Sequence, residues 1–414
     1  MNRKILYISE CHIYGGSERS IVNIMNFISE NPHNKVYFCY RRFNIYQEGL
    51  KRDLTNRVIQ VPLCLLSYFA LSFQIGKRIR NIYAWKFIKL PFWLIKKMGF
   101  YDLFNYVLLS IYIRRIKPDI IHINNGGYPG SSVCINAVFA AKHSGVKRIV
   151  FHINNPAAKQ KNLFQKYIDM RIGDYVDVFI SGAYQTKQSL QTNRNFPSDK
   201  LVQIFNTIER PIISKKGEEI KKQYNIDKNS FVISEVAFLS KRKGQIFLLE
   251  ALLKIKQSQP DIYKNIILFL VGDGEDYDYL HNFCKTNELN NVVMTGYVPN
   301  YADYIYASDL FVLPSIGYED MPLVILAAMA LRKSIISTRV AGIMEEIVDG
   351  VSGILLDIDE LGHLDKHIIK LFKDERTRDF YAENAQKRYN DLFSRETICS
   401  QFELVYDKLM VDKS

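Results

Sequence analysis

Residues 317–331 have the sequence GYEDMPLVILAAMAL and follow the apolar run 310–313, so the local order is strand, loop and helix. Asp320 is a favourable N-cap residue, and Pro322 fits the first helical turn because its missing N–H costs nothing there. The first-turn amides would suit an anion such as a diphosphate, with Glu319 at the mouth of the loop. Taken alone, the stretch favours an ordinary capped core helix, so any function must be argued from neighbouring segments.

The chain has 414 residues, too many for one ordinary core, and its length predicts two or three domains. Six cysteines are scattered without a CxxC motif or metal-ligand spacing. This usage indicates a reduced, cytoplasmic compartment and no metal cofactor. The apolar run after the basic N-terminus is too short for a signal peptide and predicts a first strand over residues 4–8.

The formal net charge of +12 is unevenly distributed. No acidic residue occurs between Asp53 and Asp102, where basic residues mix with Trp and Phe. Such a mixture is typical of a segment lying on a membrane surface. The residues expected to make this contact are Trp85, Lys86, Lys89, Trp93, Lys96 and Lys97. Nucleic acid is a weaker alternative, because bulky aliphatic side chains would be wasted on phosphates.

The uncharged stretch 58–76 is long enough for a short membrane-spanning helix. Its proline, glutamines and serines lower its hydrophobicity. A buried or interface-dipping segment is therefore preferred, although a true span remains the alternative.

Two successive sets of alternating strands and helices predict two doubly wound α/β domains. In the first set, a strand leads into Gly15 and Gly16, and glycine allows backbone amides to approach a phosphate closely. A plain turn is the simpler interpretation, and the lack of a three-glycine fingerprint disfavours a nicotinamide site. His152 lies where a strand ends, as either a ligand contact or a core histidine.

The predicted domain boundaries follow from the order of strands and helices and from the polar composition of the stretch between the two sets. Residues 1–208 form the first domain, with a basic aromatic insertion over 57–115. A polar, lysine-rich linker is predicted over 209–230. The second domain covers 231–390, and a C-terminal helix is expected within 391–414.

Together these segments resemble the family-4 retaining glycosyltransferases of the GT-B fold, also called glycosyl transferases group 1. The resemblance covers most of the chain, and its strength lies in the order and spacing of motifs that are weak individually. The motifs are Gly15-Gly16-Ser17-Glu18-Arg19, residues 119–122, His152, Asn206, Lys243-Gly244, Gly272-Asp273-Gly274, Thr295-Gly296-Tyr297, Ala307-Ser308-Asp309, Pro314-Ser315, residues 319–324, Ala328-Met329-Ala330 and residues 342–353.

The resemblance implies two facing Rossmann-like domains, a cleft between them and a last helix that crosses back to the first domain. It implies a nucleotide-sugar donor and no metal or other cofactor. Glu319 and His152 would be catalytic, with Glu319 at the donor sugar and Lys243 at the diphosphate. The full set of implied donor-binding residues is Gly15, Gly16, Lys241, Arg242, Lys243, Gly272, Met321, Leu323 and Val324.

The sequence departs from the family pattern at two positions. Ala327 stands where the family has a glutamate that usually holds the ribose hydroxyls, and Phe238 replaces an arginine that usually contacts the diphosphate. Each lost charged hydrogen bond could weaken donor binding by about 1.5–3 kcal/mol. Lys241 or Arg242 could compensate for the second loss.

The resulting hypothesis is a hexosyltransferase-type enzyme (EC 2.4) that transfers a sugar, with retention, to a glycan or lipid-linked acceptor. It would act in cell-surface polysaccharide or glycolipid synthesis, in the cytoplasm at the inner face of the membrane. The alternative is a catalytically weakened GT-B protein that binds a ligand or a partner. A nucleotide-sugar epimerase is less favoured, because that function gives no reason for the basic aromatic insertion.

Overall fold

The computed structural model describes residues 3–11, 14–68, 82–317 and 319–411, with the side chains of 82–88 left out. The chain divides into two compact units. Unit 1 comprises Met1–Ile204 and Cys399–Ser414, and unit 2 comprises Phe205–Ile398. Each unit contains its own parallel sheet, as the two sets of alternating strands and helices predict.

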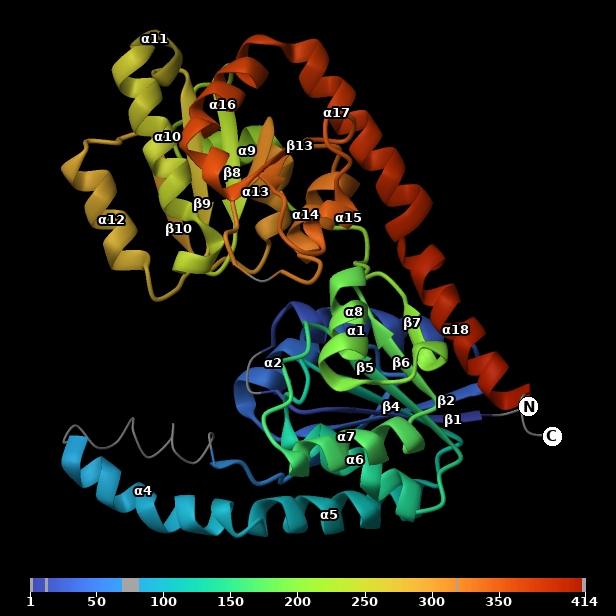
Figure 1. Cartoon of the computed structure of the whole chain (residues 1–414). Helices are drawn as coiled ribbons and strands as arrows, with labels where there is room; N and C mark the ends of the chain where they lie inside the picture. Colours follow the sequence, from blue (N-terminus) through green and yellow to red (C-terminus); the bar gives the residue numbers. More distant parts are fainter. Residues whose placement is uncertain (1–2, 12–13, 69–81, 318, 412–414) are drawn as a thin grey trace. The chain divides into compact units, whose positions relative to one another are not determined.

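Unit 1 is built on a seven-stranded parallel sheet with the order β3-β2-β1-β4-β5-β6-β7 (Figure 1). Its strands are β1 Arg3–Ser9, β2 Asn34–Arg41, β3 Ile59–Leu63, β4 Ile120–Asn125, β5 Arg148–Ile153, β6 Val178–Ser181 and β7 Leu201–Gln203. Every residue of β4 and β5 is buried, as expected for central strands of a parallel sheet that is covered on both faces. The strand order reverses between β1 and β4, and ligands of open α/β sheets bind beyond the carboxyl ends at such a point.

The helices of unit 1 are α1 Gly16–Ile28, α2 Asn44–Asp53, α4 Ile82–Lys97, α5 Phe100–Ile116, α6 Ser132–His143, α7 Leu163–Tyr175 and α8 Tyr184–Arg194. A short 3₁₀ helix, η1, covers Ser198–Lys200. Figure 1 shows α6 and α7 between the sheet and α5. The predicted insertion 57–115 thus contains β3, α4 and nearly all of α5.

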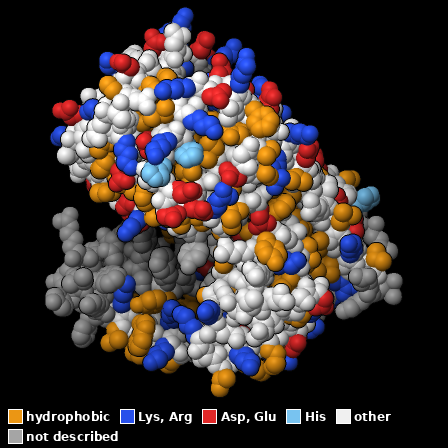
Figure 2. All heavy atoms as spheres, turned by 45° about the horizontal axis from the view of Figure 1, so that its top comes forward, with side chains coloured by type: hydrophobic (Ala, Val, Ile, Leu, Met, Phe, Trp, Pro, Cys, Tyr) orange, Lys and Arg blue, Asp and Glu red, His pale blue; other side chains and the backbone are white. Residues whose placement is uncertain are grey.

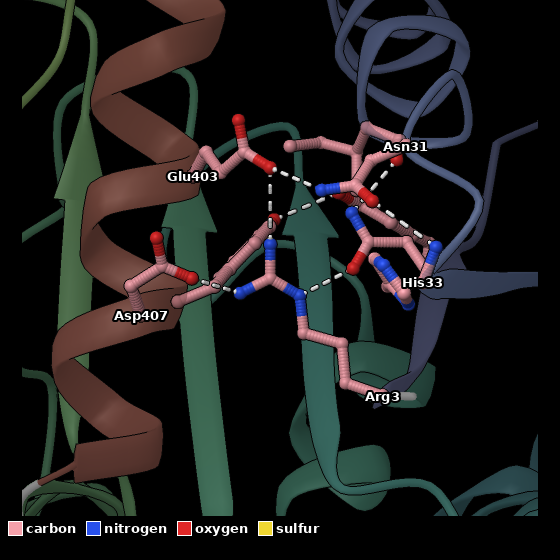
Figure 3. A network of polar contacts seen from close by, with 9 residues as sticks. Arg3, Asn31, His33, Glu403 and Asp407 are labelled. Carbon is pink, nitrogen blue, oxygen red and sulfur yellow. Dashed lines mark hydrogen bonds and ion pairs between the residues drawn. The ribbon is translucent and has the colours of Figure 1, made fainter. Parts of the chain in front are cut away.

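The C-terminal helix α18, Arg395–Val411, begins in unit 2 and belongs to unit 1 from Cys399 onward. Its acidic side chains bind the first strand: Arg3 forms ion pairs with Glu403, at 3.3 Å, and with Asp407 (Figure 3). Glu403 also accepts a hydrogen bond from the Asn31 side chain at 3.2 Å. These contacts fix the helix against β1, so the predicted return of the last helix to the first domain is confirmed.

Unit 2 is built on a six-stranded parallel sheet with the order β10-β9-β8-β11-β12-β13. Its strands are β8 Phe231–Val236, β9 Ile266–Val271, β10 Val292–Gly296, β11 Leu310–Leu313, β12 Ser334–Thr338 and β13 Ile354–Leu356. The order reverses between β8 and β11. The loops that follow these two strands therefore meet at one place on the carboxyl edge.

The helices of unit 2 are α9 Gly217–Gln223, α10 Gln245–Ser258, α11 Pro260–Tyr263, α12 Tyr277–Thr286, α13 Tyr301–Ala307, α14 Leu323–Ala330, α15 Ile343–Glu346, α16 Leu364–Lys373 and α17 Glu375–Arg388. The 3₁₀ helices η2 Lys241–Lys243 and η3 Ile358–His363 and the π-helix η4 Tyr389–Phe393 complete the unit. The stretch predicted as a linker, 209–230, lies inside unit 2 and contains α9. The Ser214 amide in this stretch donates to the Asp303 carboxylate at 2.8 Å.

Aspartates at the starts of three strands perform the same structural task. Asp119, Asp177 and Asp309 each accept a hydrogen bond from a backbone amide of the neighbouring strand, at 2.8 Å in every case. Two of these residues, Asp119 and Asp309, belong to the motifs that carry the resemblance. Their contacts show a role in aligning strands.

Candidate active site

Three loops at the carboxyl edge of the unit 2 sheet are held together by backbone hydrogen bonds. The Ile316 amide donates to the Arg242 carbonyl at 2.8 Å, and the Leu239 amide donates to the Asp273 carbonyl at 3.0 Å. Gly244 has a φ of +77°, and a Cβ there would lie 2.0 Å from the Pro314 carbonyl oxygen. Only glycine permits this close approach, which joins the loop after β8 to the loop after β11.

Glu319 is the centre of a charged cluster in these loops. Its Oε1 atom lies 2.7 Å from an Arg242 guanidinium nitrogen and 2.5 Å from Lys243 Nζ, and it accepts a hydrogen bond from Ser315 Oγ at 3.0 Å. The side chains of Glu319 and Lys243 are 7% and 11% exposed, whereas that of Arg242 is 44% exposed. The structure thus brings together the residues that were predicted separately for the donor sugar and the diphosphate.

The loop between Glu319 and α14 is fixed by contacts from distant residues. A Cβ on Gly342 would lie 1.4 Å from the Asp320 carbonyl oxygen, and the Asn206 side-chain amide donates to the Met321 carbonyl at 3.4 Å. Helix α14 begins at Leu323 with Pro322 at the N-cap position. The prediction that Asp320 caps this helix is therefore wrong, because the chain enters the helix two residues later.

The other predicted donor-binding residues lie around the same edge. Lys241 is exposed at the start of η2, and the amides of Leu323 and Val324 belong to the first turn of α14, where a helix has no internal acceptors. Gly272 follows β9, where a Cβ would lie 1.9 Å from the Ala237 carbonyl oxygen. This close backbone contact shows that Gly272 is needed for packing.

The two departures from the family pattern differ in their surroundings. Phe238 is 60% exposed, so the loop after β8 presents an aromatic ring to solvent at that position. Ala327 is fully buried in the middle of α14. The helix therefore supplies no carboxylate at this position, and the methyl group of Ala327 is packed in the core.

Two buried carboxyl groups near Lys243 were not predicted from the sequence. Glu235 in β8 and Glu346 in α15 are almost completely buried, and neither carboxyl group has a hydrogen-bond partner within the described part of the chain. Burial raises the pKa of each group well above its ordinary value, because it disfavours the charged form. Glu235 lies inside an apolar strand, a signal that could have marked it as unusual.

Gly15 and Gly16 lie at the carboxyl end of β1 in unit 1. Gly15 occupies the N-cap position of α1, and a Cβ placed on it would have no neighbour within 4 Å. Beneath this loop, the buried Glu18 carboxylate accepts hydrogen bonds from Ser9 Oγ at 3.0 and 3.2 Å and from the Tyr46 hydroxyl. Burial raises the pKa of Glu18 to about 7, a property that its place in the Gly-Gly motif did not reveal.

His152 lies in the core of unit 1, at the penultimate position of β5. Its ring packs 5.5 Å from the His122 ring and 5.6 Å from the Phe402 ring of α18. The side chain is 1% exposed, and neither ring nitrogen has a hydrogen-bond partner among the described residues. Burial lowers the pKa of His152 to about 4, so the imidazole is neutral. The structure therefore places His152 among core aromatic residues.

The predicted membrane-contact residues lie on α4, although the side chains of Trp85 and Lys86 fall outside the described part. Trp93 is exposed, and Lys97 Nζ lies 5.0 Å from the centre of its ring. Lys96 is exposed, whereas Lys89 is half-buried. Residues 69–76 of the stretch 58–76 also lie outside the described residues.

The described residues contain neither a candidate membrane span nor a candidate metal cluster. None of the helices there is sufficiently long and apolar to cross a membrane. No group of three or more His, Cys, Asp or Glu side chains in that same part of the chain is arranged to hold a metal ion.

The charged cluster and its loops lie within a segment that matches a known family. Residues 216–388 match the model of the family Glycosyl transferases group 1. The two α/β units, each built on a parallel sheet, have the GT-B fold, as predicted. The crystal structure of Anabaena Alr3699/HepE in complex with UDP has a TM-score of 0.75 at 18% identity, over 98% of this chain and 100% of that chain.

Two of three relatives in sequence are named as glycosyltransferases, and one is named as a synthase. MJ1069 of Methanocaldococcus jannaschii, an uncharacterised glycosyltransferase, is 23% identical over 96% of this chain and 95% of its own length. The N-acetyl-alpha-D-glucosaminyl L-malate synthase of Bacillus anthracis is 29% identical over 53% of this chain and 56% of its own. The capsular polysaccharide biosynthesis glycosyltransferase CapM of Staphylococcus aureus is 28% identical over 46% of this chain and 49% of its own length.

Proposed function

We propose that this protein is a retaining glycosyltransferase of the hexosyltransferase type that uses a nucleoside-diphosphate sugar as donor. The observation that carries the proposal is the contact of Arg242 and Lys243 with one oxygen of Glu319. Two cations and one carboxylate leave a net positive charge at the carboxyl edge of a parallel sheet, where α/β proteins bind ligands. A diphosphate is the ligand class that this charge suits.

Lys243 and Arg242 are suited to stabilising the diphosphate as it leaves. In the transfer, the bond between the anomeric carbon and the diphosphate oxygen breaks, and a bond forms to an acceptor hydroxyl oxygen. The hydroxyl proton passes to the leaving diphosphate. A fixed lysine charge stabilises the negative charge that develops on the leaving oxygen. Arg242 is sufficiently exposed to turn from Glu319 toward a bound donor.

Glu319 is suited to a second task, at the sugar. The contacts with Lys243 and Ser315 keep the carboxylate in a fixed position, and it can accept hydrogen bonds from sugar hydroxyls. Its negative charge also favours the positive charge that develops on the sugar ring in the transition state. The roles that the resemblance implies for Gly15, Gly16 and His152 of unit 1 remain predictions. The proposal includes no resident metal.

A cell-surface glycan or glycolipid is the proposed product, formed at the inner face of the membrane on a glycan or lipid-linked acceptor. Support comes from the name of CapM and from the exposed Trp93 beside Lys97 on α4. UDP is the first nucleotide to test, because Alr3699/HepE was crystallised with it.

The direct test is nucleotide-dependent thermal stabilisation followed by product analysis. We expect at least one of UDP, GDP, ADP, CDP and TDP to raise the melting temperature, and Lys243→Met to abolish that rise. Mass spectrometry of a sugar-nucleotide panel with lipid-linked acceptors should then reveal a product one sugar heavier. Stabilisation by none of the nucleotides would refute the proposed donor class.

A second candidate function is favoured by Ala327 and Phe238. A protein without the usual ribose carboxylate and diphosphate arginine could bind a ligand or partner without transferring sugar. This candidate predicts nucleotide binding with no product from any sugar nucleotide. Product formation by the wild-type protein that is lost in Glu319→Ala would exclude this second candidate.

A further inference from the structure

Helix α5 presents apolar side chains on two opposite faces. One face is buried against α6 and includes Leu109 and Ile113. The other face carries a stripe of exposed side chains with helical spacing, each between 41% and 59% exposed: Phe100, Leu103, Phe104, Val107 and Ile111. A soluble surface helix normally has polar side chains on such a face, so this stripe requires a partner or an apolar environment.

Helix α7 carries a second exposed apolar stripe. Its members are between 55% and 83% exposed: Leu163, Phe164, Tyr167 and Met170. Both α5 and α7 flank α6, and Figure 1 shows α6 and α7 above α5. The two stripes thus belong to helices on either side of one central helix.

An apolar groove of about 590 Å³ lies between these helices. We call it the α5–α7 groove. Its apolar walls come from α5, α6 and α7: Leu103, Ile135, Phe139, Phe164 and Ile168. Tyr106 and His143, joined by a hydrogen bond of 2.9 Å, are polar members of the lining. The volume falls within the range of small-molecule sites and the walls are mostly hydrocarbon.

Basic residues outnumber acidic ones on α4, α5 and α7 taken together. Exposed or half-buried basic residues lie on the three helices that carry exposed apolar side chains: Lys96, Lys97, Arg114, Arg115, Lys166 and Arg171. The carboxylates of the lining are bonded to other groups: Asp169 pairs with Arg194 at 3.1 Å, and Asp102 accepts from Asn136 at 3.3 Å. Figure 2 shows hydrophobic and basic side chains side by side at the lower left, on the side where α4 lies in Figure 1.

We propose that the α5–α7 groove binds a hydrocarbon chain of a bilayer lipid, with the two apolar stripes in the interface of an anionic membrane. Exposed apolar side chains beside lysine and arginine have the composition of an interfacial membrane contact. The excess of basic residues on these helices favours this occupant over a second copy of the chain, because two copies would place basic residues against each other. This inference rests on the membrane part of the proposed function, and it assigns the contact to α5 and α7 as well as α4.

The test is binding of the full-length protein to vesicles. We expect it to bind vesicles of phosphatidylcholine with about 30% phosphatidylglycerol, and to bind phosphatidylcholine alone at least five-fold less, since each basic residue near an anionic surface contributes about a five-fold factor. Leu103→Asp combined with Phe164→Asp should lower binding about ten-fold or more. Ile45→Asp is the matched control, because Ile45 is an exposed apolar residue on α2 of the same unit.

A photoreactive lipid tests the groove itself. Phosphatidylglycerol with a diazirine in its acyl chain should crosslink to α6 peptides that contain Ile135 or Phe139. Crosslinks confined to α4, or equal vesicle binding by the double variant and the Ile45 control, would overturn the proposal. So would a lipid-free dimer that Leu103→Asp with Phe164→Asp dissociates, because the groove would then be an interface between copies.

The donor-binding assay separates this inference from the proposed function. If the groove is a lipid site, the double variant keeps its thermal stabilisation by nucleotide while vesicle binding falls. Vesicle binding that depends on the groove, without stabilisation by any nucleotide, would refute only the proposed donor. Nucleotide binding without groove-dependent vesicle binding would refute only the lipid site.

Discussion

Replacement of Glu319 by Gln would test whether one carboxylate organises the charged cluster of unit 2. The substitution keeps the size of the side chain and removes its charge. Arg242, at 44% exposure, can then turn into water, but Lys243, at 11% exposure, is left without its nearest counter-charge. Loss of one partner from a mostly buried ion pair costs about 3–5 kcal/mol. The glutamine oxygen still accepts a hydrogen bond, so we expect a loss of about 2–3 kcal/mol in the free energy of unfolding.

The same substitution should lower kcat for sugar transfer by about 10²–10³, because a fixed charge at the reacting centre contributes that much in the transition state. Urea unfolding near neutral pH measures the first effect, and initial rates with the sugar nucleotide measure the second. Glu383→Gln is the matched control. Glu383 pairs with Arg332 in the same unit, and their side chains are 63% and 50% exposed, respectively. Such surface pairs contribute about 0–1 kcal/mol to stability.

The predicted effects on stability and on sugar transfer can be refuted independently. If Glu319→Gln is no less stable than Glu383→Gln, the cluster does not stabilise unit 2. If stability falls while transfer is unchanged, Glu319 holds the loops together without acting on the sugar. The double variant Lys243→Met with Glu319→Gln should recover part of the stability, because it removes both charges, but it should not recover transfer.

Three further predictions concern other parts of the chain. Gly342→Ala should displace the loop at Asp320, since a Cβ would lie 1.4 Å from its carbonyl oxygen, and nucleotide-dependent stabilisation should be lost; unchanged stabilisation would contradict this. Glu18 has a folded-state pKa of about 7, above its ordinary 4.5, so it contributes stability that is present below 4.5 and is lost as the pH rises to 7. Glu18→Gln should therefore flatten the decline of unfolding free energy over this range, and an unaltered pH profile would argue against it. Tyr406→Phe should cost about 1–3 kcal/mol in urea unfolding, because it leaves His122 Nδ1, now 2.6 Å from the hydroxyl, without that partner; a cost below about 0.5 kcal/mol would mean that another group replaces the bond.

Sequence patterns predicted the sheets well because buried parallel strands are short apolar runs. The strand predicted over 310–313 coincides with β11, and the return of the last helix to the first domain is confirmed. The cap at Asp320 was predicted wrongly. Contacts from Gly342 and Asn206, both distant in sequence, hold that loop, and no local pattern encodes them.

The residues of the site were easier to predict than their mutual contacts. Glu319 and Arg242 were assigned to different parts of a donor, yet their side chains pair across 77 positions of sequence. Position alone also left His152 open as ligand contact or core residue. The structure places its ring against Phe402, a contact that depends on the docking of α18 on unit 1.

The division of unit 1 into two chain segments has a consequence for folding during synthesis. Its first 204 residues leave the ribosome early, but the helix that covers Tyr7 and His122 is made last. Unit 2, whose residues are contiguous, can complete its core before α18 is finished. The domain that is synthesised first is therefore completed last, and a fragment ending near residue 204 would expose the aromatic residues that α18 covers.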